Sequence, residues 1–223
     1  MEITHLPLGM VNAYLIKTDN FSFLVDSGLS IKRKKLEAAL AKAGVAPGDL
    51  KLVIATHGDF DHIGNCAWLQ KKYGVKIAIH EADASLCRTG SSNIKRTRTS
   101  SFISRIPRKI LFALLFKPLM KKYPLELFEP DIFLSDSQDL RSFGLDARVF
   151  HLPGHSSGSI GIHTAEGDFF SGDTINNRSK PAVGDLVENI AALETSITKI
   201  RSLKIRNVYP GHGKPFAMAD MKF

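Results

Sequence analysis

Four potential metal ligands stand within six residues, directly after a short apolar run. After Leu-Val-Ile-Ala, residues 56–62 read Thr-His-Gly-Asp-Phe-Asp-His. Alternate residues of an extended chain share one face, so His57 and Asp59 can reach the same ion. Asp61 is next on that face and His62 begins a helix-like run, so this pair suits a second ion. A solvated polar loop would also explain the motif by itself, because short motifs often occur by chance.

Three further sites share this design, since each places one His or Asp beside glycine where an apolar run ends. They are His155 after 147–152, Asp173 after 168–171 and His212 after 207–209. Glycine lets the backbone turn sharply there and keeps side-chain bulk away from a ligand. Four strand ends on one sheet edge would gather seven ligands: His57, Asp59, Asp61, His62, His155, Asp173 and His212. Two ions roughly 3.5–4 Å apart can bridge a hydroxide and lower the pKa of bound water to about 7.

The composition is that of an ordinary globular domain. The 223 residues are 43% hydrophobic and 23% charged, which is enough chain for one large core. Two cysteines, Cys66 and Cys87, exclude a disulfide framework and a cysteine-rich zinc module. Residues 1–16 show no basic head followed by an apolar core, and no apolar run approaches the roughly 20 residues that span a bilayer. We therefore expect a cytoplasmic location.

Short apolar runs and helical periodicity predict an α/β chain with two similar halves. In the first half we expect strands at 2–6, 12–17, 21–25, 52–55 and 75–79, and helices at 31–43 and 63–73. In the second half we expect strands at 132–134, 147–152, 160–163, 168–171 and 207–209. A helical spacing predicts one further helix packed on a sheet, through Leu186, Ile190, Leu193, Ile197 and Ile200.

The positive charge of the chain is concentrated in one segment. Residues 88–127 contain ten Lys or Arg and one acidic residue, a local charge of +9 in a chain of formal net charge +8. We interpret this segment as a basic insertion of two or three short helices, with Pro107 starting one and Pro118 ending it. Beside a metal site, its charge would attract an anionic substrate. The alternatives are a lid or homodimer element, and a contact of 105–123 with a membrane surface.

The ligand set resembles that of the metallo-β-lactamase fold hydrolases, whose motifs run Asp, His-x-His-x-Asp-His, His, Asp, His. The resemblance covers nearly the whole chain apart from the 88–127 insertion. It implies a four-layer αββα sandwich of the α/β class, formed by residues 1–223 as a single domain. It also implies a dinuclear metal site between the two sheets.

The resemblance assigns a role to each ligand. By the family pattern, the first metal is bound by His57, Asp59 and His155, the second by Asp61, His62 and His212, and Asp173 bridges the two. Asp26 matches the first motif, whose Asp supports the metal ligands without binding the metal itself. Thr56, Ser156 and Thr174 are expected to orient ligands through their hydroxyl groups. Asp61 is the expected catalytic residue, because a carboxylate near the nucleophile can orient it or accept its proton.

The sequence departs from the family pattern at position 59, where Asp stands in place of the usual His. A carboxylate is a harder, anionic ligand, which suits iron or manganese better than an all-imidazole site does. Zinc also tolerates Asp and is the metal we expect, with two divalent ions per chain. The related flavodiiron oxidoreductases carry a Glu at this place. Asp59 therefore leaves a di-iron site open as an alternative.

We expect a metal-dependent hydrolase that uses a metal-bound hydroxide on a small anionic ester, either a phosphodiester or a thioester. The alternative from another class is a di-iron oxidoreductase acting on oxygen or a thiol. A non-catalytic, metal-dependent binding protein is the third alternative, and it is disfavoured because every ligand position carries a ligating residue type. No motif for sequence-specific nucleic-acid binding is present.

Overall fold

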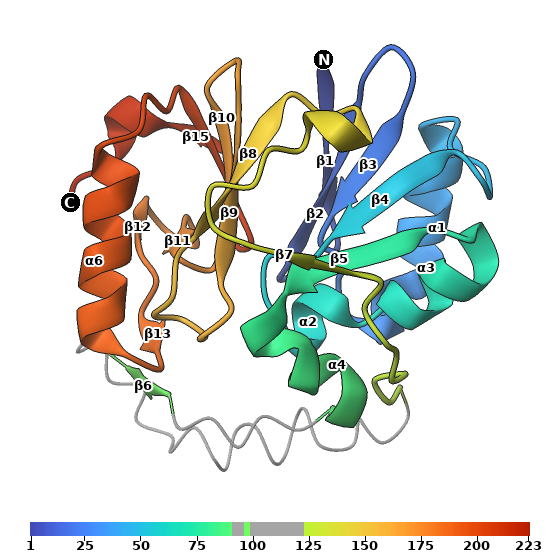
Figure 1. The fold of residues 1–223 in the computed structure, drawn as a ribbon, viewed down its shortest axis with the longest axis horizontal. Coiled ribbons are helices and arrows are strands. Elements are labelled where there is room, and N and C mark those ends of the chain that lie inside the picture. The colour runs from blue at the N-terminus through green and yellow to red at the C-terminus, as the bar shows by residue number, and fades with distance from the viewer. Residues whose placement is uncertain (91–95, 99–122) are drawn as a thin grey trace.

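The computed structural model of the chain describes residues 1–90, 96–98 and 123–223. Two β-sheets pack face to face, and helices cover the outer face of each sheet (Figure 1). The layers therefore follow the order helix, sheet, sheet, helix. This arrangement confirms the four-layer αββα sandwich expected from the sequence.

The first sheet has six strands, and their order is β1-β2-β3-β4-β5-β7. Their bounds are Glu2–Pro7 (β1), Asn12–Lys17 (β2), Ser22–Val25 (β3), Leu50–Ile54 (β4), Lys76–His80 (β5) and Ile132–Leu134 (β7). The first three strands are antiparallel, whereas β3, β4, β5 and β7 run parallel. Because parallel strands end at the same edge, the residues that follow β3, β4 and β5 lie next to one another.

The second sheet has five strands in the order β15-β14-β10-β9-β8. Their bounds are Ala147–His151 (β8), Ile160–Thr164 (β9), Asp168–Gly172 (β10), Asn207–Pro210 (β14) and Phe216–Ala217 (β15). Strands β10 and β14 are parallel, so Asp173 and His212 follow them at one edge. Two further ribbons pair β11 (Ile175–Asn176) with β12 (Ala182–Val183), and β13 (Leu186–Val187) with β6 (Thr97–Arg98).

The α-helices of the described residues are α1 (Arg33–Lys42), α2 (Phe60–Ile63), α3 (Cys66–Tyr73), α4 (Ala84–Thr89) and α6 (Ile190–Arg201). Short 3-10 helices occupy Ser30–Lys32, Glu81–Asp83, Arg141–Phe143 and Met218–Asp220. Helices α1 and α3 pack on the first sheet through Leu36, Leu40 and Leu69, which belong to its outer core cluster. Helix α6 packs on the second sheet, where Ile200 lies in a cluster with Phe169 and Val208.

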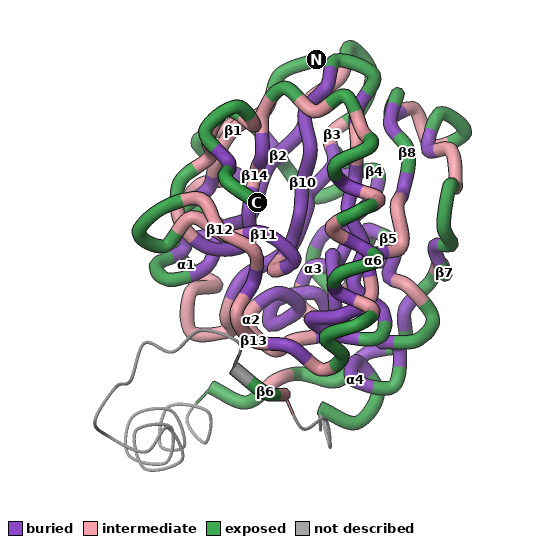
Figure 2. The backbone as a smooth tube through the Cα atoms, turned by 90° about the vertical axis from the view of Figure 1, so that its left-hand side faces the viewer, coloured by how far each residue is buried: buried purple, intermediate pink, exposed green. Residues whose placement is uncertain are grey.

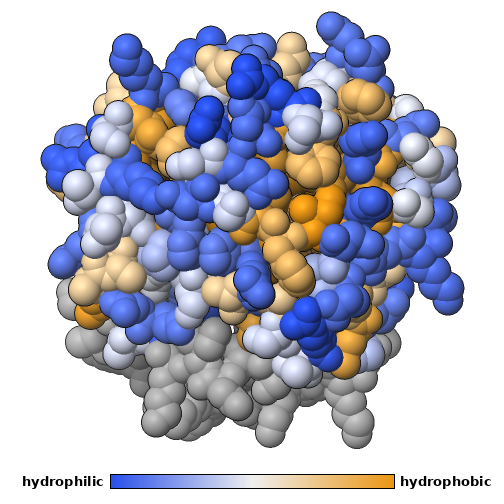
Figure 3. Space-filling model, in the orientation of Figure 1, coloured by the Kyte–Doolittle hydropathy of each residue, from blue (hydrophilic) through white to orange (hydrophobic). Residues whose placement is uncertain are grey.

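The buried residues form a cluster on each side of each sheet, because successive side chains of a strand point to opposite faces. Along β2, Ala13 and Leu15 face the helices, whereas Tyr14 and Ile16 face the second sheet. Figure 2 shows mostly buried residues along the central strands and many exposed residues along α6. The face in Figure 3 is mostly hydrophilic, apart from an apolar patch near its middle. The apolar residues thus mainly fill the spaces between the layers.

Two helix predictions were wrong in part. The helix expected from Leu186 begins at Ile190, because 186–187 form β13 and the Asn189 side chain caps the helix by accepting a 3.0 Å hydrogen bond from Ala192 N. The helix expected over 63–73 is two helices separated by Gly64 and Asn65. A Cβ at Gly64 would lie 2.6 Å from the carbonyl oxygen of Gly28, so the chain turns there against neighbouring backbone.

The helices predicted inside the 88–127 insertion lie mostly outside the described residues. Within the described part, α4 ends at Thr89 and β6 pairs with β13. None of the helices in the described ranges combines the length and the apolar character needed to cross a bilayer. The lid, the homodimer, the membrane contact through 105–123 and the cytoplasmic location stay predictions.

Candidate metal centre

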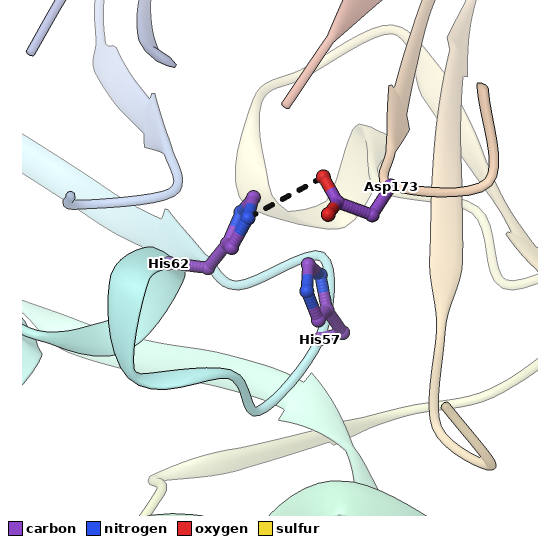
Figure 4. A group of neighbouring side chains, drawn as sticks. All are labelled: His57, His62 and Asp173. Atoms are coloured by element: carbon purple, nitrogen blue, oxygen red, sulfur yellow. Dashed lines mark ion pairs between the residues drawn. The ribbon is translucent and has the colours of Figure 1, made fainter. Parts of the chain in front are cut away.

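Seven side chains meet at the edge where the strands of the two sheets end. The β4 loop and α2 supply four of them, namely His57, Asp59, Asp61 and His62, and the loops after β8, β10 and β14 supply His155, Asp173 and His212. Figure 4 shows His57 and His62 from the first half of the chain facing Asp173 from the second half. The structure therefore brings together every residue that the sequence predicted as a metal ligand.

Two of the histidines have a ring orientation that follows from their hydrogen bonds to backbone carbonyls. His155 Nδ1 donates to Leu186 O at 2.7 Å, and His212 Nδ1 donates to Met10 O at 2.5 Å. A carbonyl oxygen can only accept, so Nδ1 carries the proton in each ring. In the neutral imidazole, the Nε2 of each ring is then an unprotonated acceptor directed at the centre.

His57 and His62 are held in the same way through Asp26. His62 Nδ1 donates to Asp26 Oδ2 at 2.8 Å. The Thr56 hydroxyl donates to Asp26 Oδ2 at 2.9 Å, so its oxygen is left to accept from His57 Nδ1 at 3.0 Å. A hydroxyl has only one hydrogen to donate. All four histidines therefore direct Nε2 towards the centre, the orientation in which imidazole binds a metal.

The ligand atoms form two neighbouring groups. In the first group, Asp59 Oδ2 lies 3.2 Å from His155 Nε2 and 3.5 Å from His57 Nε2. In the second group, Asp61 Oδ2 lies 3.5 Å from His212 Nε2 and 3.9 Å from His62 Nε2. The atoms of each group lie within 4.8 Å of one another.

Asp173 lies between the two groups. Its Oδ2 is 3.2 Å from His212 Nε2 and 3.8 Å from His155 Nε2, and its Oδ1 is 3.4 Å from His62 Nε2. One carboxylate thus reaches a histidine of each group. This is the placement that a bridging ligand requires.

The donor set fits divalent metal ions. When the rings are neutral, imidazole acceptors face carboxylate acceptors, a pairing that needs a cation, either a proton or a metal ion, between them. Two ligands of a tetrahedral ion with bonds of about 2.0–2.1 Å lie roughly 3.3 Å apart, which is close to the spacing of the atoms in both groups. Among the described residues, His57 Nε2, His62 Nε2 and Asp173 Oδ1 are buried polar atoms with no hydrogen-bond partner. The two groups are candidate His/Asp sites of a dinuclear centre.

The carboxylates and imidazoles of the centre shift one another's pKa values. Burial lowers the pKa of His62, but Asp26, Asp173 and Asp61 outweigh burial and raise that pKa to about 10. Burial raises the pKa of Asp173, whereas His212 and His62 hold it well below its usual range. These shifts keep Asp173 negatively charged and favour a positive charge next to it.

The other residues expected to support the ligands differ in what they contact. Ser156 Oγ donates to Asp83 Oδ2 at 2.7 Å and lies 2.7 Å from Ser159 Oγ, so it anchors the loop that carries His155. The Thr174 hydroxyl is buried and has no hydrogen-bond partner in the described part of the chain. The described residues therefore give Thr174 no ligand to orient.

Asp83 is a supporting residue that the sequence analysis missed. It is buried and accepts hydrogen bonds from Gly58 N at 2.8 Å and from Gly158 N at 2.7 Å, besides that of Ser156. It therefore connects the loop of His57 and Asp59 to the loop of His155. The pattern that identified the ligands could have identified it too, because Asp83 is a carboxylate shortly after the predicted strand 75–79.

Arg96 is the second residue that the sequence analysis missed. Its Nη1 donates a hydrogen bond to Asp59 Oδ2, the oxygen that faces His57 and His155. Burial raises the pKa of Asp59, but His155, His57 and Arg96 hold it well below its usual range. The sequence offered no means of choosing Arg96 from the other basic residues of the insertion.

Comparisons of the sequence with known proteins identify the family of the chain. The sequence pattern of the Metallo-beta-lactamase superfamily matches residues 6–212. The chain is 25% identical over 218 residues to the human acyl-coenzyme A thioesterase MBLAC2, covering 92% of this chain and 74% of that protein. It is 26% identical over 211 residues to the probable metallo-hydrolase MJ0888 of Methanocaldococcus jannaschii, covering 91% and 87%. The beta-lactamase-like protein 2 homolog of Drosophila melanogaster is 26% identical over 206 residues, which are 91% of this chain and 58% of that protein.

Solved structures share the fold. The crystal structure of TTHA1623 in a di-iron-bound form is 26% identical and superposes with a TM-score of 0.68, covering 98% of this chain and 96% of that chain. The BLEG-1 B3 metallo-beta-lactamase is 23% identical with a TM-score of 0.74, covering 98% and 95%, and this likeness concerns the fold alone. The chain belongs to the metallo-beta-lactamase superfamily of metallo-hydrolases.

Proposed function

We propose that this metallo-hydrolase cleaves an anionic ester at a dinuclear centre, with a thioester as the first substrate class to test and a phosphodiester as the second. The observation that carries the proposal is the gathering of four Nε2 atoms and three carboxylates in two adjoining groups. The thioester is placed first because the human relative is an acyl-coenzyme A thioesterase by name. Zinc is the proposed metal, since the ligand set is mainly imidazole.

Each protein group has a definite part in this reaction. Divalent ions in such a centre supply a nucleophile at neutral pH by lowering the pKa of water, and they polarise the bond that is cleaved. Asp26 fixes His62 directly and His57 through Thr56. The Asp61 side chain is 23% exposed, more than those of Asp59 and Asp173 at 15% and 10%. Asp61 is therefore the carboxylate best placed to orient an incoming nucleophile and accept its proton.

The second candidate function is a di-iron oxidoreductase acting on oxygen or a thiol. Asp59 favours it, because a third carboxylate gives the centre a harder ligand set than an all-imidazole first site would have. The relative TTHA1623 has been crystallised in a di-iron-bound form. A di-iron protein absorbs in the near-ultraviolet and visible range, whereas a zinc protein does not, so an absorption spectrum separates the two candidates.

Hydrolysis assays of the metal-loaded protein test the proposal. The substrates are an acyl-coenzyme A thioester and bis(4-nitrophenyl) phosphate, each assayed before and after metal removal with a chelator. We expect metal-dependent turnover that Asp173→Ala abolishes and that Asp139→Asn, a change at a surface carboxylate paired with Arg141, leaves intact. Redox-active colour from two irons, together with no hydrolysis of either substrate, would overturn the proposal in favour of the oxidoreductase.

A further inference from the structure

The Arg96 side chain reaches the metal centre from a position next to β6, and β6 pairs with the strand that orients His155. It directly precedes β6, which pairs with β13 through Thr97 opposite Val187 and Arg98 opposite Leu186. Leu186 is also the residue whose carbonyl accepts the hydrogen bond from His155 Nδ1 at 2.7 Å. The backbone that carries Arg96 is therefore tied to the backbone that orients a candidate ligand.

Among the described residues, the Arg96 guanidinium has a hydrogen-bond partner for one of its three nitrogens. Its side chain is 10% exposed, and Nη1 donates to Asp59 Oδ2. Nε and Nη2 are buried and have no hydrogen-bond partner among the described residues. A guanidinium carries five N–H donors in a fixed planar arrangement. A buried donor without an acceptor costs free energy, because it has lost its hydrogen bonds to water. These two nitrogens therefore lack acceptors in the part of the chain that the structure describes, and an acceptor on a bound substrate would satisfy them.

The pair of Arg96 and Asp59 has the net charge of the histidine that usually occupies position 59. Asp59 adds one negative charge to the centre, and Arg96 adds one positive charge at the same place. Unlike a neutral histidine, however, the pair keeps N–H groups beside the first group of ligands that have no partner among the described residues. A counter-ion alone would not need a planar fork, because a lysine could supply the charge.

We propose that Arg96 is a specificity-determining residue that binds an oxyanion of the substrate, a carboxylate or a phosphate close to the scissile bond, through Nε and Nη2 while Nη1 holds Asp59. The inference rests on the proposed hydrolase function and deepens it by naming the substrate feature that the centre recognises. Planar guanidinium is the side chain best matched to the two oxygens of a carboxylate or phosphate. The preferred substrates are esters that carry a negative charge on or near the reacting group.

A kinetic test uses two esters that differ in one carboxylate, 4-nitrophenyl butyrate and mono-4-nitrophenyl glutarate, with bis(4-nitrophenyl) phosphate as the phosphate arm. Arg96→Lys keeps the charge beside Asp59 but removes the fork, and Arg148→Lys makes the same change at an exposed arginine paired with Asp139. We expect Arg96→Lys to raise KM for an anionic ester by about 10- to 100-fold. For the neutral ester we expect KM within about twofold of wild type.

An equal rise in KM for the neutral and the anionic esters would contradict the proposal. It would make Arg96 a structural counter-ion. A rise confined to the glutarate ester identifies a carboxylate as the recognised group, and one confined to the phosphodiester identifies a phosphate. Metal content of the purified Arg96→Lys protein should equal that of wild type. If that variant does not fold, Arg96→Gln replaces it in the same assays.

A binding measurement separates this inference from the hydrolase function. Calorimetric titration of the metal-loaded protein with inorganic phosphate needs no turnover, so it remains informative if neither ester is hydrolysed. We expect Arg96→Lys to weaken phosphate binding by about tenfold or more, and Arg148→Lys to leave it unchanged. Equal affinity in wild type and Arg96→Lys would overturn the assignment, even if the protein hydrolyses esters.

Discussion

Asp26 accepts a 2.8 Å hydrogen bond from His62 Nδ1 while its own backbone has a φ of 58°. A non-glycine residue in this left-handed region stores backbone strain, and such strain is concentrated at functional sites. The same carboxylate receives the Thr56 amide at 2.8 Å and the Thr56 hydroxyl at 2.9 Å. Asp26 therefore orients two candidate ligands, His62 directly and His57 through Thr56.

The first prediction concerns Asp26→Asn. The change preserves size but removes the charge that favours the Nδ1 proton of His62, so we expect metal affinity to fall about 10- to 100-fold. Elemental analysis after dialysis against graded metal concentrations measures the loss. Ser137→Gly, at the other described non-glycine residue with positive φ (62°), is the control and should keep full metal content. Unchanged affinity in Asp26→Asn would contradict the role assigned to this residue.

The second prediction concerns Asp83→Ala. This change leaves Gly58 N, Gly158 N and the Ser156 hydroxyl without their common acceptor in a buried place. We expect the metal-free protein to lose about 3 kcal/mol or more in free energy of unfolding, measured by urea denaturation. Glu129→Gln, which breaks an exposed pair with Arg88, should cost less than about 1 kcal/mol. A similar small loss in both variants would show that Asp83 does not connect the two loops.

The third prediction concerns proton release on metal binding. Because the pKa of His62 in the metal-free protein is about 10, this ring is protonated at neutral pH and must lose a proton when Nε2 binds a metal. Titration calorimetry in two buffers of different ionisation enthalpy should therefore reveal released protons. Identical heats in both buffers would contradict this account of His62.

The same pKa shift fixes the sign of a stability effect in the metal-free protein. A pKa raised from 6.5 to about 10 means that protonated His62 stabilises the folded state fully below pH 6.5. That contribution is lost as the pH rises through about 10. Metal-free protein should thus become less stable between neutral and alkaline pH, as chemical denaturation across that range will show.

The fourth prediction concerns Gly211→Ala in the loop that carries His212. A Cβ at this position would lie 2.5 Å from Asp173 Oδ1 and 2.6 Å from His62 Cε1. We expect this variant to fold but to bind markedly less metal, because two ligands must move. Gly74→Ala is a useful control, since it strains a φ of 62° but has no atom within 4 Å of the added carbon. It should lose about 1 kcal/mol of stability and keep its metal.

The candidate centre could be predicted from the sequence because its residues follow one rule. His155, Asp173 and His212 each stand beside glycine after an apolar run, and those runs are β8, β10 and β14. Asp83 obeys part of the same rule after β5 and could have been found. Arg96 could not, because its contact with Asp59 depends on the pairing of β6 with a strand almost 90 residues further along.

The start of the α6 helix shows where periodicity fails. Leu186 continues the helical spacing of Ile190 and Leu193, yet it lies in β13, because its strand partner is Arg98. Spacing along the chain carries no information about such a partner. The cap at Asn189 was the local signal that marked the true start of the helix.

The measurement that tests the central claim most directly is the metal content of the purified wild-type protein, beside that of Asp173→Ala. The account predicts close to two zinc ions per wild-type chain and a clear loss when the carboxylate between the two ligand groups is removed. One ion per chain would show that one of the two ligand groups binds metal more weakly than the other. Wild-type protein that retains no divalent metal after equilibration with zinc would contradict the dinuclear centre.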